Sequence, residues 1–194
     1  RIVESIVSFG ILIITFPILF FSALLIKIED GGPIFYSQIR NGFEGNQFKI
    51  IKLRTMIINA EKNGAQWASK EDIRITKIGA FLRKLRIDEL PQLLLVLSGE
   101  MSLIGPRPER PKIDMMLREN LPNYDLRYSI KPGISGWAQV NYPYGASIED
   151  AKIKLSYDLF YIKNFSILLD FMIYFKTLKL VINGKGASPI KNKS

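Results

Sequence analysis

A run of apolar residues near the amino terminus limits what this chain can fold into more than any other feature. Between Ser5 and Ile26 there is no charged residue, and most positions are Ile, Leu, Phe, Val or Ala. As a helix these 22 residues would extend about 33 Å, enough to cross a bilayer core of about 30 Å. We therefore expect a membrane-embedded helix at residues 1–28, followed by a separate domain at residues 29–194.

Two other interpretations explain the run less well. A secretory signal has a shorter apolar region and a cleavage site of small residues, and no such site follows here. A buried helix of a soluble protein would need a much larger protein around it, because large apolar side chains cover all faces of this one.

Pro17 lies near the middle of the run. It removes one helix hydrogen bond and clashes with the preceding turn, so a bend is expected there. Each half would cover less than about 20 Å, too short to cross a bilayer alone. Arg1 and Lys27 flank the run, and positive flanks prefer the cytoplasmic side. This symmetry favours a re-entrant helix, with a kinked spanning helix as the alternative.

The composition narrows the chemistry. Lys and Arg outnumber Asp and Glu by 27 to 18, and the net charge of +9 favours nucleic acid, an anionic membrane or a phosphorylated substrate as partner. The chain has no Cys and no His, which excludes disulfides, thiolate chemistry, His-based triads and the usual zinc sites. An enzyme built on it must use carboxylates, Lys, Arg, hydroxyls and a hard cation such as Mg²⁺.

The pattern after the apolar run predicts an α+β fold that is mostly helical. Short strands are expected at residues 34–36 and 48–53, around a polar turn. Two helical stretches are expected between residues 78 and 97, with a break at residues 88–91 and an end at Gly99.

The second half of the chain predicts further helices around proline-rich loops. A helix is expected at residues 111–120 and a loop-rich region at residues 131–145. Residues 149–182 look helical, with charges interrupting an aromatic and apolar stripe. We expect interfacial amphipathic helices there, and a helix face packed in an ordinary core is the alternative.

Basic residues gather before an acidic pair. Residues 49–86 hold ten Lys and Arg against three Asp and Glu. This bias predicts an electropositive phosphate pocket, with Arg54, Arg83 and Arg86 as candidates. A basic surface that faces solvent or lipid headgroups is the alternative.

Asp88 and Glu89 lie at the expected start of a Leu-rich helix. A helix N-terminus keeps a carboxylate ionised, so the pair is a catalytic candidate, whereas an ordinary N-cap is the alternative. Arg107 lies between two prolines, which hold it rigidly as a hydrogen-bond donor that suits a phosphate. Its alternatives are a helix cap or a pair with Glu100.

These residues belong to a longer signature. Its central segments are Arg83-x-x-x-x-Asp88-Glu89-Leu90-Pro91-Gln92-Leu93 and Gly99-Glu100-Met101-Ser102-Leu103-Ile104-Gly105-Pro106-Arg107-Pro108. Its other segments are Gly32-Pro33-Ile34-Phe35, Phe48-Lys49-Ile50 to Arg54-Thr55-Met56, and Lys131-Pro132-Gly133-Ile134-Ser135-Gly136-Trp137-Ala138-Gln139-Val140-Asn141. Together they closely resemble the bacterial monotopic phosphoglycosyl transferases, also called bacterial sugar transferases or undecaprenyl-phosphate sugar-phosphate transferases. The resemblance covers nearly the whole chain.

The resemblance implies a reaction and a site. A nucleotide-diphosphosugar, usually a UDP-sugar, gives its sugar-1-phosphate to polyprenyl phosphate and releases the nucleoside monophosphate. Asp88 would form a covalent phosphosugar intermediate and contact Mg²⁺, and Glu89 would position the acceptor or handle its proton. Arg54, Arg83 and Arg107 match family positions for donor or phosphate binding.

The resemblance also implies a location and partners. The apolar run matches the family's re-entrant helix, although Phe16 replaces the Ser of the family's Ser-Pro bend and leaves Thr15 as a nearby hydroxyl. Residues 131–147 resemble the longer exopolysaccharide and O-antigen branch, so a chain that opens at Arg1 is expected to be a catalytic C-terminal part. We expect the bacterial inner membrane, with the catalytic domain on its cytoplasmic face. Expected partners are a nucleotide sugar, polyprenyl phosphate and membrane lipid, whereas nucleic acid is not expected. Nothing in the sequence fixes the oligomeric state, so a second copy of the chain is a possible further partner.

Two other functions compete with this one. A membrane-tethered basic module would bind anionic lipid or nucleic acid without turnover. An inactive scaffold of a polysaccharide assembly would keep the fold without the activity.

Overall fold

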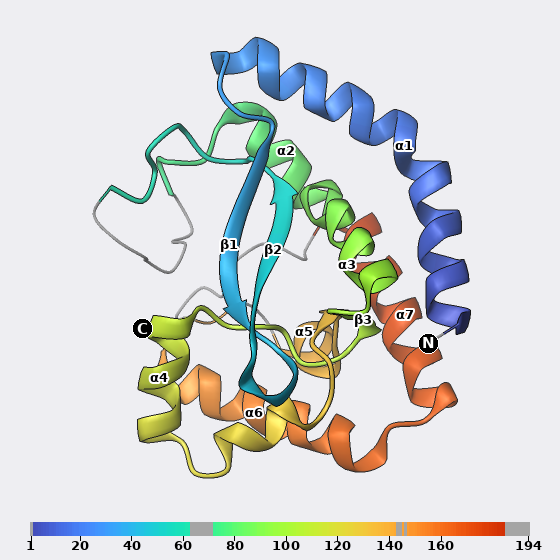
Figure 1. Ribbon diagram of the computed structural model, residues 1–194, viewed down its shortest axis with the longest axis vertical. Coiled ribbons are helices and arrows are strands. Elements are labelled where there is room, and N and C mark those ends of the chain that lie inside the picture. The colour runs from blue at the N-terminus through green and yellow to red at the C-terminus, as the bar shows by residue number, and fades with distance from the viewer. Residues whose placement is uncertain (1, 63–71, 143–144, 146, 185–194) are drawn as a thin grey trace.

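The computed structural model describes residues 2–62, 72–142, 145 and 147–184 (Figure 1). Within them a two-stranded ribbon lies at the centre, and helices surround it on several sides (Figure 1). Helices clearly outweigh strands, so the predicted α+β, mostly helical class is confirmed.

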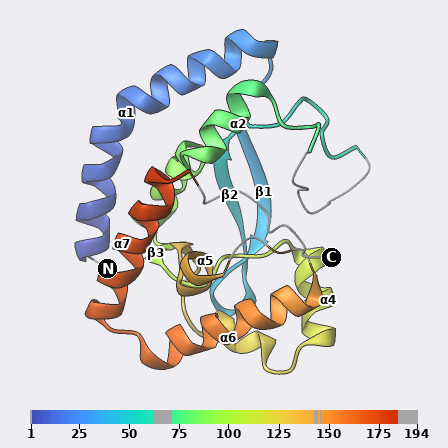
Figure 2. The ribbon, with the colours of Figure 1, turned by 180° about the vertical axis from the view of Figure 1, so that it is seen from behind.

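The apolar run forms one long helix, α1 (Ile2–Asp30), with Pro17 inside it. Figures 1 and 2 show this helix bending partway along its length. The Thr15 hydroxyl donates to the carbonyl of Ile11 at 2.7 Å, and such a back-bond from Thr promotes helix bending. The expected bend is therefore present in α1, and the hydroxyl two residues before Pro17 bonds the preceding turn.

Both ends of α1 attach to the rest of the protein. Near the first end, the Glu4 carboxylate accepts hydrogen bonds from the Ser102 hydroxyl and from the backbone N–H of Leu103. At the other end, Asp30 forms an ion pair with Arg54 at 2.5 Å. Between these contacts most of the helix is exposed, and its 29 residues are long and apolar enough to cross a membrane.

The central ribbon pairs β1 (Phe35–Asn41) with β2 (Gln47–Leu53) in antiparallel register. A short 3-10 turn, η1 (Phe43–Gly45), joins the two strands. The predicted strand pair is confirmed, and both strands are longer than expected. A second sheet pairs β3 (Ser102–Ile104) with β4 (Gly133–Ser135) in parallel.

Three short helices follow one another beside β2. They are α2 (Lys77–Lys84), the 3-10 helix η2 (Ile87–Gln92) and α3 (Leu93–Ser98). The break expected in this region is therefore a 3-10 segment. Gly99 ends α3 with φ +88°, a left-handed conformation that suits glycine at a helix end.

The helix predicted after the proline-rich loop is confirmed as α4 (Pro111–Asn120). It is followed by the 3-10 helix η3 (Tyr124–Ser129). The prediction of a loop at residues 131–145 was incomplete, because the region contains β4 and the short helix α5 (Trp137–Asn141).

The last helical region consists of two helices rather than one. They are α6 (Ile148–Asn164) and α7 (Ile167–Ile182), and Ser147 and Ser166 cap their starts. The two helices differ in how much of their apolar surface is buried, and membrane contact by either of them stays a prediction. Leu155 of α6 belongs to a buried core cluster with residues of α4 and η3. In contrast, α7 exposes a row of large apolar side chains, namely Ile167, Leu168, Phe171, Phe175, Leu178 and Ile182.

Both α1 and α7 carry exposed apolar side chains. The start of α1 runs beside α7 in both views of the ribbon (Figures 1 and 2). Surfaces of this kind are typical of proteins that contact a membrane.

Candidate active site

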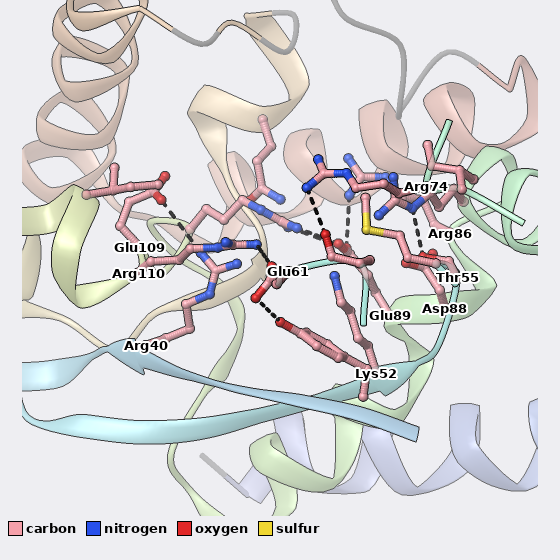
Figure 3. A pocket seen from close by; sticks show the side chains of 18 of the residues that line it. Arg40, Lys52, Thr55, Glu61, Arg74, Arg86, Asp88, Glu89, Glu109 and Arg110 are labelled. Atoms are coloured by element: carbon pink, nitrogen blue, oxygen red, sulfur yellow. Dashed lines mark hydrogen bonds and ion pairs between the residues drawn. The ribbon is translucent and has the colours of Figure 1, made fainter. Parts of the chain in front are cut away.

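A cavity of about 1070 Å³ opens between the ribbon, η2, α4 and α6 (Figure 3). The candidates Arg54, Arg83, Asp88, Glu89 and Arg107 all line it. Residues distant in the sequence therefore meet at one concave surface, and the candidates named from the sequence are brought together.

Asp88 belongs to η2 and does not cap a helix. The N-cap of η2 is Arg86, in a left-handed conformation with φ +58°, and the N-cap of α3 is Gln92. The interpretation of Asp88 as an ordinary N-cap is therefore wrong. The side chain of Asp88 is buried, and its Oδ1 atom has no hydrogen-bond partner among the described residues. An unpartnered buried carboxylate oxygen at a cavity wall is available to a ligand or a reaction.

Opposing effects act on the ionisation of Asp88. Burial, assisted by the neighbouring Glu89, raises the pKa of the Asp88 carboxyl to about 6, against the lowering effect of Lys52, Arg83 and Arg86. The carboxylate is thus ionised at neutral pH but only weakly stabilised. A weakly stabilised anion is more basic than an ordinary Asp, which suits a nucleophile.

Glu89 is held by two arginines. It accepts from Arg107 at 2.5 Å and from Arg86 at 2.9 Å. Burial opposes its ionisation, but Arg107 and Arg86 outweigh burial and hold the pKa of Glu89 well below its usual range. The expected alternative partner of Arg107, Glu100, accepts instead from the Ser98 hydroxyl at 3.2 Å.

Two other cations face the acidic pair. Arg83 donates to the hydroxyl of Thr55 at 2.8 Å. Lys52, on β2, points toward the acidic pair in Figure 3, and its burial lowers the pKa of its amino group to about 8. Sequence reasoning missed Lys52 as a site residue, although it lies in the basic region that was singled out.

Arg54 is occupied by protein groups. Its guanidinium bonds both carboxylate oxygens of Asp30 at 2.5 Å, the carbonyl of Pro33 at 2.5 Å and that of Met56 at 3.3 Å. These contacts join the end of α1 to the end of β2. The role of Arg54 in phosphate binding stays a prediction.

The acidic pair fits a magnesium ion only in part. Among the described residues no group of three or more potential metal-ligating side chains gathers, and both oxygens of Glu89 are engaged by arginines. Asp88 offers one unpartnered oxygen. Mg²⁺ commonly binds one or two carboxylates together with waters and substrate phosphates. These residues therefore fit an ion that arrives together with the diphosphate of the substrate, and not an ion that the protein binds alone.

Comparison with known sequences decides the family. The sequence pattern of the bacterial sugar transferases matches residues 1–184. The chain belongs to the bacterial sugar transferase family. The resemblance found in the motifs is thereby confirmed.

Similar bacterial sugar transferases act on undecaprenyl phosphate, according to their names. The chain is 49% identical over 172 residues to UDP-N-acetylgalactosamine-undecaprenyl-phosphate N-acetylgalactosaminephosphotransferase of Aeromonas hydrophila, covering 88% of this chain and 40% of the relative. It is 41% identical over 180 residues to UDP-glucose:undecaprenyl-phosphate glucose-1-phosphate transferase of Klebsiella pneumoniae, covering 92% and 39%. The chain thus spans about two fifths of the length of these relatives. An uncharacterized sugar transferase of Bacillus subtilis, EpsL, is 36% identical and is covered over 88% of its length.

Proposed function

We propose that this bacterial sugar transferase moves a sugar-1-phosphate from a UDP-sugar to undecaprenyl phosphate and releases UMP. The observation that carries the proposal is the unpartnered Oδ1 of Asp88 in the wall of a cationic cavity. The names of the relatives support the two substrates. The reaction would be the first membrane step of exopolysaccharide, O-antigen or other glycoconjugate synthesis.

In the first step, an oxygen of Asp88 attacks the phosphorus that bears the sugar. A bond forms between that oxygen and phosphorus, and the bond from phosphorus to the bridging oxygen breaks. UMP leaves with the electron pair, and the sugar phosphate remains on the protein. A carboxylate can act as such a nucleophile without His.

In the second step, a phosphate oxygen of the acceptor attacks the same phosphorus. The bond from phosphorus to Asp88 breaks, and the free carboxylate returns. Glu89 supports this step by holding Arg107 and Arg86 beside the phosphates. Its lowered pKa makes it a poor proton acceptor, which favours positioning over proton transfer as its role.

Cations would offset the charge of the diphosphate. Lys52, Arg83, Arg86 and Arg107 line the cavity around the acidic pair, and such groups stabilise charge that spreads over a transferred phosphoryl group. Asp88 and the substrate phosphates would hold Mg²⁺, which neutralises phosphate charge when bound.

The reaction is tested with purified membranes that contain the protein. We expect UMP release only when a UDP-sugar, undecaprenyl phosphate and Mg²⁺ are all present, and chelation of Mg²⁺ should reduce the rate at least about 100-fold. A panel of UDP-sugars then identifies the donor. Salt-sensitive lipid binding without any UMP release would instead support a basic binding module.

We also propose that α1 enters the membrane from the cytoplasmic face and returns to it. The contacts of Glu4 and Asp30 support this, because they bring both ends of α1 to the same domain. A straight spanning helix would place its ends on opposite faces of the bilayer. The inner membrane, with residues 29–194 at its cytoplasmic face, is the proposed location.

Cysteine labelling tests this topology, since the chain has no Cys of its own. Ile2→Cys and Ile28→Cys change exposed residues at the two ends, and Ile14→Cys changes an exposed residue near the bend. With a membrane-impermeant maleimide, both end positions should react in inverted vesicles and neither in intact spheroplasts. Ile14→Cys should be protected in both preparations. Reaction of the two ends from opposite faces would contradict the proposal.

A further inference from the structure

The wall of the cavity also contains three guanidinium–carboxylate pairs that the proposed reaction does not use. These distal pairs are Arg40 with Glu109 (3.6 Å), Arg110 with Glu61 (2.7 Å) and Arg127 with Asp158 (3.0 Å). All six side chains line the cavity. In Figure 3, Arg40, Glu109 and Arg110 lie on one side, and Asp88 lies on the other.

Each guanidinium of the distal pairs keeps one buried nitrogen without a partner among the described residues. These atoms are Nε of Arg40, Nη1 of Arg110 and Nε of Arg127. A buried donor that stays unpaired costs about 1–3 kcal/mol. All three arginines line the same cavity, and a small turn of each guanidinium toward it would present these nitrogens to a ligand that supplies oxygen acceptors.

The net charge around the distal pairs indicates which kind of oxygen acceptor they would bind. The three distal pairs carry no net charge, because each arginine faces one carboxylate. Lys154 also lines this region, and its amino group donates to the carbonyl of Gly145 at 2.8 Å. With Lys154 counted, this region carries a net charge of about +1, whereas Lys52, Arg83, Arg86 and Arg107 against Asp88 and Glu89 give about +2 around Asp88. An anionic phosphate is therefore better matched near Asp88 than at the distal pairs.

We infer that the distal pairs bind the hydroxyl groups of a neutral sugar ring. A hydroxyl oxygen accepts from the free N–H groups, while its proton can be donated to Glu61 or Glu109. The inference rests on the proposed function, because the UDP-sugar donor brings two such rings. They are the hexose that is transferred and the ribose of the nucleoside.

The experiment measures donor selectivity in Glu109→Gln and Arg110→Gln. These side chains are 27% and 17% exposed, so the substitutions are milder for the fold than a change at Arg127. One arm compares kcat/KM for two UDP-hexoses that differ only at the C4 hydroxyl. The other compares a UDP-sugar with its 2′-deoxyuridine analogue. Because a site that bonds a hydroxyl discriminates strongly against its absence, at least one ratio should change about tenfold or more.

The two arms identify the ring. A changed epimer ratio places the hexose at the distal pairs, and a changed deoxy ratio places the ribose there. Glu119→Gln is the matched control, since its carboxylate lies on the exposed part of α4, and it should change neither ratio. Should the thermal unfolding midpoint show that a variant is unfolded, Glu61→Gln replaces it, because Glu61 is the most exposed of the six at 30%.

Unchanged ratios in folded variants, with UMP still released by the wild-type protein, would overturn the inference alone. A wild-type protein that releases no UMP from any donor would overturn the proposed function instead.

Discussion

Replacement of Asp88 by Asn is expected to lower UMP release by at least about 10³-fold, as loss of a covalent nucleophile does in other enzymes. The amide has nearly the same shape as the carboxylate, but its oxygen cannot form the phosphosugar bond. The variant should also fail to retain label from a donor that is radioactive in its sugar. Initial rates of UMP release and the amount of labelled protein on a denaturing gel measure both effects.

The matched control for this prediction is Asp125→Asn. Asp125 is 71% exposed on η3 and pairs with Arg118 at the surface, so its loss should leave both UMP release and labelling intact. Full activity in Asp88→Asn would refute the covalent mechanism. Loss of activity with the label retained would assign the nucleophile to another residue. A wild-type protein without turnover or label would fit an inactive scaffold.

Replacement of Asp158 by Ala is expected to lower the free energy of unfolding by about 3–5 kcal/mol. Asp158 is buried and pairs with the equally buried Arg127 at 3.0 Å. Without it, the guanidinium keeps its contacts to the Tyr124 hydroxyl and to the carbonyl of Arg107 but loses its counterion. The measurement is denaturant unfolding in detergent micelles, above the pKa of about 6 to which burial raises the Asp158 carboxyl.

A surface pair provides the comparison for Asp158. Asp125→Ala removes an exposed contact to Arg118, and exposed pairs contribute about 0–1 kcal/mol. Equal losses in the two variants would show that burial adds nothing to the Arg127–Asp158 pair.

Local sequence patterns predicted those helices whose start, length or end is determined by neighbouring residues. The apolar run gave α1, the proline-rich loop gave the start of α4, and Gly99 marked the end of α3. In each case neighbouring residues determine the backbone, through helix length, a fixed φ or a left-handed turn. The same reasoning missed β4, because a parallel strand pair depends on a segment about thirty residues away.

The candidate site was predictable as a set of residues but not as a set of contacts. Asp88, Glu89 and Arg107 were named from the sequence, whereas the pairing of Arg107 with Glu89 required the fold. The buried pair of Arg127 and Asp158 was missed. Asp158 lies on the same face of α6 as the buried Leu155 and Tyr161. An acidic residue on the apolar face of a helix could have indicated a buried ion pair.

The two attachments of α1 have a mechanical consequence. Asp30 is bonded to Arg54, two residues beyond Lys52 on the same chain segment, while Glu4 is bonded to Ser102 and Leu103 of β3. If a helix held in this way tilts in a bilayer, the Asp30–Arg54 contact transmits the movement toward the strand that carries Lys52. In a re-entrant arrangement, a change in how deeply α1 enters the bilayer would therefore be passed on to the wall of the cavity.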